Sequence, residues 1–308
     1  MTHERSSSPF TNCILSYDLS PLTEGFFITF ENMEYKGVSF KDKLMLNYIR
    51  KIPNHPAKIR LVNWLNDIWL GGGLNLISPN GSKYNFSTKE FIGHEIIYSG
   101  SYEPLTLKLC EEILQEGGVF VDIGANVGLF SIHLSVNKNV STYAVEPSFE
   151  NFQRLINNIN RNQLSNVTPA NIGLSCEDSF GYLVNHSVEN SGTFKVVESH
   201  NDLNSYLIRL TTLSELLRYL KIKEIDLIKI DIEGYEMNVF KGLFTDNNVR
   251  PKNIVMEFSG LMERTGYTMD DCYNYFIALG YRAYDVLGGE YKLGDSVPEC
   301  NIWWKYNN

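Results

Sequence analysis

The sequence predicts a doubly wound α/β fold. We expect a Rossmann-like sheet of seven mostly parallel strands with an antiparallel edge, preceded by an extension of helices and a β-hairpin. From Glu103 onward, short apolar runs typical of strands alternate with segments whose apolar residues recur at the three-and-four spacing of helices. The expected strands are almost continuously apolar, as in parallel sheets that helices cover on both faces. The last two expected strands form a hairpin-like pair, which indicates an antiparallel edge.

Strands and helices alternate over most of the chain after residue 100. The expected strands cover residues 119–123, 141–146, 167–174, 225–231, 253–258, 281–286 and 301–306. The expected helices cover residues 105–114, 127–136, 149–162, 212–222, 235–244 and 269–280. Residues 179–210 interrupt this alternation and have the pattern of a strand-rich insertion or hairpin.

Residues 1–99 have a different pattern, and we treat them as an extension to a domain that spans residues 100–308. Segments 41–52 and 57–70 carry apolar residues at helical spacing, and Asn80-Gly81 lies between two alternating runs, as in a β-hairpin. This extension contains no recognisable catalytic or binding motif. We expect a cap or an element through which a homodimer forms, and the alternative is a lid that shapes a substrate pocket.

Composition and charge argue against several classes of function. The net charge of −9 and the isoelectric point of about 5.2 disfavour nucleic-acid and anionic-membrane partners, because phosphate binding depends on clustered Lys and Arg. No apolar segment has the length of a signal peptide or a membrane span, so we expect a cytoplasmic protein. The five cysteines form no C-x-x-C pair and are odd in number, so we expect reduced thiols.

Residues 119–130, VFVDIGANVGLF, place an acid, two glycines and an amide where a strand passes into a helix. In doubly wound sheets, ligands bind at this carboxyl edge. Gly124 permits a tight turn, and Gly128 lets the helix start close to the strand and the ligand. The free N–H groups of the helix start suit a carboxylate or a phosphate. Asp122 can face an ammonium group, and Asn126 offers both a donor and an acceptor.

The next expected strand ends in YAVEP, which places Glu146 18 positions after Gly128. An acid at this distance is expected to accept hydrogen bonds from the two hydroxyls of a ribose. A dinucleotide fingerprint would need glycines where Asn126 and Leu129 stand. The turn fits the pattern D-x-G-x-N-x-G of an S-adenosylmethionine loop better, because that cofactor has an ammonium group for Asp122. The alternative is a glycine turn with a purely structural role.

A third segment, IDLIKIDIEGYE at 225–236, places several acids at the same edge of the sheet. Acids in such a position are costly unless they are solvated or bonded. Glu233 and Glu236 also fit as acids at a helix N-terminus, where they favour the helix dipole. Asp231 follows the strand directly and is expected to face the pocket, with Lys229 just before it.

Together, these segments resemble the FkbM-type S-adenosylmethionine-dependent methyltransferases. The resemblance covers residues 100–258 and rests on FVDIGANVG, YAVEP followed by NFQRLINNINRN, IDLIKIDIEGYE followed by VFKGL, and GSYEP. It implies a class I methyltransferase fold and methylation of a hydroxyl on a sugar, macrolide or other secondary metabolite. With the turn itself, it gives the expected cofactor contacts: Glu103, Asp122, Gly124, Asn126, Gly128, Glu146 and Pro147. It further suggests Asp231 as a contact, and one departure is TLS, with Ser214, where the family tends to have TLD.

Methylation of an aliphatic hydroxyl needs a group that accepts its proton. The candidate bases are Asp231 and Glu233, with Glu257 and His200 as reserves. A magnesium-dependent variant, which we do not favour, would use Asp231 and Glu257, because two carboxylates on adjacent strand ends suit Mg²⁺. The spacing of the histidines argues against zinc. The acceptor would be a small molecule or a glycan, and the rival from another class is a catalytically silent nucleoside-binding scaffold in a biosynthetic complex.

Overall fold

The computed structural model describes residues 74–78, 80–86, 92–93, 95–96, 101–185, 194–197, 205–244 and 249–307, together with Asn47. Apart from Asn47, the helices expected at 41–52 and 57–70 lie outside these residues, and so does His200. Within the described ranges, no helix has the length and apolar character needed to cross a membrane.

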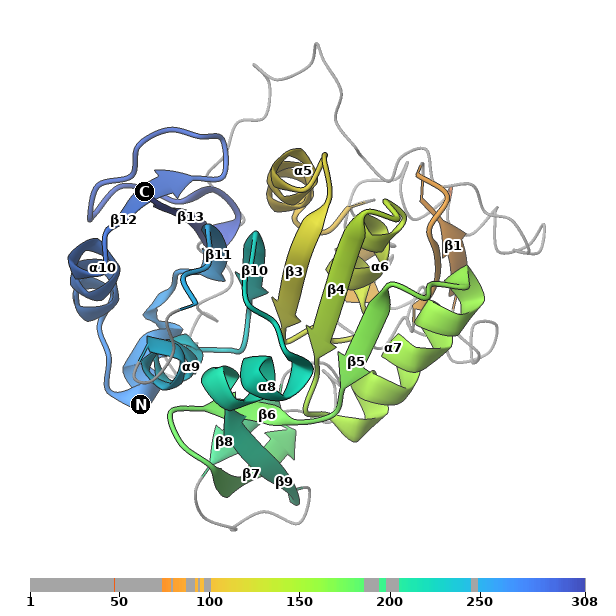
Figure 1. The fold of residues 1–308 in the computed structure, drawn as a ribbon, viewed down its shortest axis with the longest axis horizontal. Coiled ribbons are helices and arrows are strands. Elements are labelled where there is room, and N and C mark those ends of the chain that lie inside the picture. Colours follow the sequence, from red (N-terminus) through yellow and green to blue (C-terminus); the bar gives the residue numbers. More distant parts are fainter. Residues whose placement is uncertain are drawn as a thin grey trace, which may run out of the picture.

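A seven-stranded sheet forms the centre of the protein, with the strand order β12-β13-β11-β10-β3-β4-β5 (Figure 1). Its strands are β3 (Gly118–Ile123), β4 (Val140–Val145), β5 (Val167–Ala170), β10 (Leu227–Ile230), β11 (Asn253–Glu257), β12 (Tyr281–Asp285) and β13 (Asn301–Tyr306). The strands from β11 to β5 are parallel to one another, and β13 is antiparallel to both β11 and β12. The predicted doubly wound sheet with an antiparallel edge is therefore confirmed.

Helices cover both faces of this sheet, as predicted. One layer contains α5 (Pro104–Ile113), α6 (Leu129–Ser135) and α7 (Phe149–Asn162), and the other contains α8 (Leu213–Leu220), α9 (Glu236–Phe244) and α10 (Met269–Ala278). The two layers bury alternate residues of the same strands, because successive side chains of a strand point to opposite faces. Leu227 thus belongs to the core with α5–α7, and Ile228 to the core with α8–α10. The described residues also form two short 3-10 helices, η3 (Gly260–Thr265) and η4 (Pro298–Cys300).

The predicted strand-rich insertion belongs to a second, four-stranded sheet with the order β6-β9-β7-β8. Its strands are β6 (Gly173–Ser175), β7 (Ser179–Asn185), β8 (Phe194–Val197) and β9 (Ser205–Thr212). The single strand expected at 167–174 is wrong, because β5 and β6 divide this segment between the two sheets. Asn171 lies between them and donates hydrogen bonds to the backbone oxygens of Glu146 (2.8 Å) and Pro147 (3.1 Å). These bonds fix the point at which the chain leaves the main sheet.

The predicted hairpin is confirmed as β1 (Leu74–Ile77) and β2 (Lys83–Phe86), with Gly81 at a φ of 89° in the turn. Tyr84 and Phe86 are fully buried in the same core as α5–α7. The Tyr84 hydroxyl also donates to the backbone oxygen of Leu129 at 3.2 Å. The hairpin therefore packs as part of the core beneath α5–α7.

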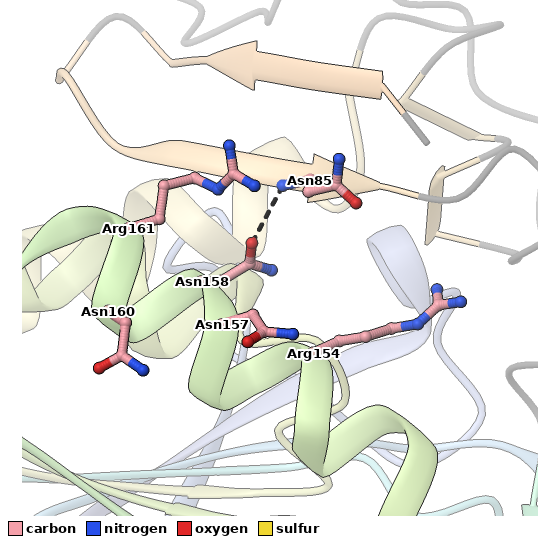
Figure 2. A pocket seen from close by; sticks show the side chains of 6 residues that line it. All are labelled: Asn85, Arg154, Asn157, Asn158, Asn160 and Arg161. Atoms are coloured by element: carbon pink, nitrogen blue, oxygen red, sulfur yellow. Dashed lines mark hydrogen bonds between the residues drawn. The ribbon is translucent and has the colours of Figure 1, made fainter. Parts of the chain in front are cut away.

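Amide side chains of α7 form hydrogen bonds with the backbone along the outer edge of β2 (Figure 2). Asn162 accepts from the backbone N–H of Lys83 at 2.7 Å and donates to its carbonyl oxygen at 2.6 Å. Asn158 accepts from the backbone N–H of Asn85 at 3.0 Å. These side chains replace a neighbouring strand, which protects the edge from pairing with another chain. An open pocket borders these contacts and is lined by Asn85, Arg154, Asn157, Asn158, Asn160 and Arg161.

Candidate active site

The carboxyl edge of the main sheet brings acids from four adjacent strands into register. An inner row on β4, β3, β10 and β11 consists of Ala144, Asp122, Lys229 and Val255. An outer row stands just beyond it, made of residues that end a strand or directly follow one. It consists of Glu146, Gly124, Asp231 and Glu257. Gly124 contributes no side chain, so nothing in this row stands between Glu146 and Asp231.

The turn after β3 depends on left-handed backbone conformations. The φ angles are 81° at Gly124, 50° at Asn126 and 90° at Gly128. A Cβ atom on Gly124 would lie 2.1 Å from the carbonyl oxygen of Asp231, so the turn packs directly against the end of β10. The sequence pattern thus identified a turn that only glycine permits at its first position.

Glu146 holds this turn in place. Its two carboxylate oxygens accept hydrogen bonds from the backbone N–H groups of Asn126 (2.9 Å) and Ser148 (2.8 Å). The side chain is buried, and burial raises the pKa of Glu146 to about 7 although both hydrogen bonds oppose the rise. A side-chain hydrogen bond from Asn151 adds a third bond. A carboxylate has about four lone-pair sites, so Glu146 retains capacity for a ligand hydroxyl. Pro147 follows it directly and is held through its carbonyl by Asn171.

Asp122 is turned toward the first turn of α6. Its Oδ2 atom accepts hydrogen bonds from the Ser131 hydroxyl at 2.5 Å and from the Ser131 backbone N–H at 3.1 Å. The residue is 2% exposed, and burial raises the pKa of Asp122. A contact between Asp122 and an ammonium group remains a prediction, since one of its oxygens already serves α6.

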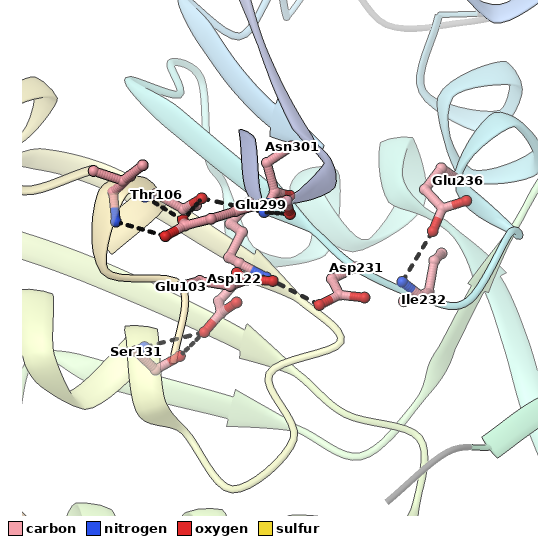
Figure 3. Close-up of polar contacts among 11 residues, drawn as sticks. Glu103, Thr106, Asp122, Ser131, Asp231, Ile232, Glu236, Glu299 and Asn301 are labelled. Atoms are coloured by element: carbon pink, nitrogen blue, oxygen red, sulfur yellow. Dashed lines mark hydrogen bonds and ion pairs between the residues drawn. The ribbon is translucent and has the colours of Figure 1, made fainter. Parts of the chain in front are cut away.

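Lys229 lies at the centre of the inner row and joins two carboxylates, those of Glu103 and Asp231, which Figure 3 labels. Its Nζ atom is 3.3 Å from Oδ2 of Asp231 and 3.6 Å from Oε2 of Glu103, and it lies 4.5 Å from the ring centre of Phe130. Burial alone would lower the pKa of Lys229, but Glu103, Asp231 and Asp122 raise it above its ordinary value. Burial raises the pKa of Glu103 to about 7, and Lys229 limits that rise.

A second turn, after β10, carries the remaining acids. Glu236 accepts from the backbone N–H groups of Ile232 (3.0 Å) and Gly234 (3.2 Å) through its Oε1 atom. Glu233 has a left-handed φ of 59° in this turn and is partly exposed. Burial, followed by the charge of Asp231, raises the pKa of both Glu233 and Glu236 to about 7. The catalytic candidates Asp231 and Glu233 therefore lie together, but with different neighbours.

The structure also places Asp231 and Glu257 on adjacent strands, as the magnesium alternative requires, because Ile230 pairs with Met256. Burial and neighbouring carboxylates raise the pKa of Glu257 well above its usual range. Asp231, however, is already ion-paired with Lys229. In the described part of the chain, no three His, Cys, Asp or Glu side chains form a group that could hold a metal ion.

Sequence reasoning missed the segment around η4. Glu299 accepts hydrogen bonds from the backbone N–H groups of Leu105 (3.0 Å) and Thr106 (2.8 Å), so it caps α5 from a distant part of the chain. This fixes the start of α5, which Glu103 immediately precedes. The next residue, Cys300, is disulfide-bonded, whereas Cys110, Cys176 and Cys272 are free. The expectation of reduced thiols is therefore wrong at Cys300, because spacing in the sequence does not reveal which cysteines meet.

Backbone strain gathers around this edge. Left-handed φ angles in residues other than glycine are unfavourable and often mark functional sites. Across the described ranges, those around the site are Glu103, Asn126, Glu233, Glu299 and Cys300. The other two, Gln163 and Lys221, end α7 and α8, where such angles are common.

A doubly wound sheet with a glycine turn and flanking acids at its carboxyl edge defines the class of nucleoside-binding α/β proteins. Within that class, the chain matches the methyltransferase FkbM domain over residues 122–283, more than half of its length. The chain belongs to this family, which confirms the resemblance predicted from the sequence.

Two curated methyltransferases are similar to parts of the chain. The hexuronic acid methyltransferase AglP of Haloferax volcanii is 29% identical over 137 residues, which cover 44% of this chain and 54% of AglP. Methyltransferase 1 of Beauveria bassiana is 24% identical over 187 residues, covering 54% of this chain and 72% of that protein. The chain thus spans about half the length of AglP.

The solved structures that this chain is similar to are distant in sequence. The human methyltransferase 10 domain containing protein is 9% identical with a TM-score of 0.43, covering 83% of this chain and 100% of that one. A putative caffeoyl-CoA O-methyltransferase from Staphylococcus aureus is 11% identical with a TM-score of 0.42, covering 82% and 100%. M. capricolum TrmK, in complex with S-adenosyl-homocysteine, is 12% identical with a TM-score of 0.36, covering 64% and 66%.

Proposed function

We propose that the protein transfers a methyl group from S-adenosylmethionine to a hydroxyl group of a sugar or another small molecule. The observation that carries this proposal is the outer row, in which Gly124 separates Glu146 from Asp231. Such a row offers an acceptor for ribose hydroxyls on one side of the turn and carboxylates for proton transfer on the other. Family membership supports the methyl transfer, and the name of AglP as a hexuronic acid methyltransferase supports a sugar acceptor.

The turn and its neighbours would bind the cofactor. Bound S-adenosylmethionine supplies a methyl group on a positively charged sulfur. Glu146 would accept a hydrogen bond from a ribose hydroxyl, because its carboxylate has more lone pairs than the bonds from Asn126, Ser148 and Asn151 use. Contacts along the turn and beside it would complete the site, from Glu103, Asp122, Gly124, Asn126, Gly128 and Pro147.

A carboxylate at the end of β10 would take up the proton. As the bond between oxygen and the methyl carbon forms and the carbon–sulfur bond breaks, the hydroxyl proton would pass to Asp231 or Glu233. A base in such a position contributes about 10²–10⁴-fold to the rate. Glu257 is the reserve. A magnesium ion between Asp231 and Glu257 is less favoured, because it would compete with the ion pair to Lys229.

The test is an incubation of the purified protein with S-adenosylmethionine and a panel of hexuronic acids, neutral sugars and non-sugar alcohols. Formation of S-adenosylhomocysteine together with a methylated acceptor, identified by mass spectrometry, is the expected result. The Asp231→Asn and Glu233→Gln variants identify the base. Binding of S-adenosylhomocysteine without turnover of any acceptor would support the silent scaffold, and binding of NAD in its place would refute the proposal.

The acidic net charge of −9 supports an acceptor that is a small molecule or glycan, not a nucleic acid or a membrane. A homodimer through residues 1–99 belongs to the same proposal. So does a cytoplasmic location, although the disulfide at Cys300 speaks against it because disulfides are rare in the cytoplasm.

A further inference from the structure

Lys229 is a buried positive charge within an otherwise apolar strand. It is 4% exposed and stands in β10, whose other three residues are buried and apolar. Placing an ammonium group in such a strand is costly unless carboxylates compensate it. An apolar residue would fill the position without that cost. The charge therefore calls for a role in the group of side chains around it.

The two carboxylates that meet Lys229 come from different elements. Glu103 precedes α5, whose start is fixed by Glu299, and Asp231 follows β10. Without a cation between them, these carboxylates would repel each other, and the charge of Asp231 contributes to the raised pKa of Glu103. Lys229 therefore links the residue before α5 to the end of β10. One oxygen of each carboxylate faces its ammonium group.

Exposure shows which side of this group is open. The side chain of Lys229 is 5% exposed, that of Glu103 is 15% exposed and that of Asp231 is 22% exposed. The lysine thus lies on the inner side, and the carboxylates lie nearer to solvent. Each carboxylate places one oxygen within 3.6 Å of the Lys229 Nζ atom, Oε2 of Glu103 and Oδ2 of Asp231. A carboxylate has about four lone-pair sites, so each can also accept from a second ammonium group on the solvent side. Asp122 is less suited, because it is 2% exposed and bonded to Ser131.

From these contacts we propose that Lys229 is a positioning residue that holds Glu103 and Asp231 as a paired receptor for the ammonium group of the cofactor. This inference rests on the proposed function and assigns Asp231 to the cofactor. The proton of the acceptor hydroxyl then falls to Glu233, which lies two residues beyond Asp231 on the strained turn and for which no ion pair with Lys229 is found among the described residues.

The experiment compares two probes by calorimetry. S-adenosylhomocysteine carries the ammonium group, and 5′-methylthioadenosine has the same nucleoside and sulfur without the amino-acid end. In Lys229→Met, we expect the Kd of S-adenosylhomocysteine to rise about tenfold or more, and the Kd of methylthioadenosine to change less than about threefold. Lys229→Arg keeps the charge but has a larger head group, so it should retain more of the affinity for S-adenosylhomocysteine than Lys229→Met does.

A purely structural role of Lys229 would weaken both probes alike, and that result overturns the inference. Equal affinities in Lys229→Met and the wild type overturn it as well. If the wild-type protein binds neither S-adenosylmethionine nor S-adenosylhomocysteine, the proposed function itself fails, and this outcome is distinct from the other two.

Single replacements of the carboxylates cover the case in which Lys229→Met does not fold, as judged by circular dichroism. Glu103→Gln and Asp231→Asn should each reproduce the selective loss of S-adenosylhomocysteine binding. Glu233→Gln is the matched control, since it should leave both affinities unchanged. Loss of S-adenosylhomocysteine binding in Glu233→Gln, with no loss in Asp231→Asn, would reverse the assignment of the two acids.

Discussion

The turns after β3 and β10 are each stabilised by a glutamate side chain that accepts backbone hydrogen bonds, but the two glutamates come from different elements. In each, a buried glutamate accepts backbone N–H groups. Glu146 accepts one from Asn126 in the first turn and one from Ser148 after its own strand, whereas Glu236 accepts two within the second turn, from Ile232 and Gly234. Glu146 comes from the neighbouring strand and uses both of its oxygens. Glu236 belongs to the helix that follows its own turn and uses only Oε1. The first glutamate therefore ties two strand ends together, whereas the second stabilises its turn locally.

This difference indicates separate roles. Glu146 reaches the first turn from a neighbouring strand and stands at the carboxyl edge of the sheet, where we propose that the cofactor binds. The second glutamate is 1% exposed, and in the part of the chain that the structure describes its Oε2 atom is buried without a hydrogen-bond partner. We expect Glu146 to serve both binding and structure, and Glu236 to serve structure alone.

The largest expected effect comes from adding a methyl group to either turn. A Cβ atom would lie 2.1 Å from the carbonyl oxygen of Asp231 at Gly124, and 2.2 Å from that of Leu261 at Gly234. Both glycines have positive φ angles, so Gly124→Ala and Gly234→Ala should each lower the free energy of unfolding by about 4 kcal/mol. Urea denaturation followed by circular dichroism measures this loss.

The matched control is Gly266→Ala. Gly266 also has a positive φ, of 83°, but a Cβ atom there would meet nothing within 4 Å. The expected loss is the conformational cost alone, about 1 kcal/mol. If Gly124→Ala or Gly234→Ala lost no more than this control, that turn would be less tightly packed than the structure indicates, and the comparison between the turns would not hold.

The dependence of stability on pH should reveal both glutamates. Burial raises the pKa of Glu146 and of Glu236 from 4.5 to about 7 in the folded protein. Because the folded state binds the proton more tightly, this stabilisation is complete below pH 4.5 and is lost as the pH rises to about 7. Each glutamate contributes up to about 3 kcal/mol to this change in the free energy of unfolding. Denaturation at pH 5 and pH 8 should show the fall.

Glu146→Gln and Glu236→Gln test the source of this pH dependence. Each replacement removes one titrating group, so each should flatten the profile by a similar amount. A double variant that retains the full slope between pH 5 and pH 8 would show that other buried acids, such as Glu103, cause it.

The same two variants should differ in ligand binding. Glu146→Gln should raise the Kd of S-adenosylhomocysteine about tenfold or more, because the ribose hydroxyls lose a charged acceptor. Glu236→Gln should leave that Kd within about threefold of the wild type. Calorimetry at pH 8 measures both, and an equal loss in the two variants would contradict the separation of roles.

How much the sequence predicted follows from the range of the contacts involved. The order of strands and helices, the glycine turn and the position of Glu146 follow from local patterns, because parallel strands bring their carboxyl ends together. The cap that Glu299 places on α5, and the pairing of Asn162 with Lys83, join residues far apart in the chain and have no local pattern. The sequence places Lys229 in a strand, but its pairing with Glu103 depends on how the segment before α5 packs in the folded protein, and no local pattern reveals that packing.

The smallest expected effect concerns the residue other than glycine that each turn holds in a left-handed conformation. Asn126 has a φ of 50° and Glu233 a φ of 59°. Asparagine tolerates this region better than glutamate does, because its short side chain bonds locally to the backbone. Glu233→Gly should therefore raise the free energy of unfolding by about 0.5–1 kcal/mol, and Asn126→Gly should raise it less. Denaturation at pH 8 measures the difference. Equal gains would mean that the two turns are equally strained, and that the strain at Glu233 is no sign of a special role.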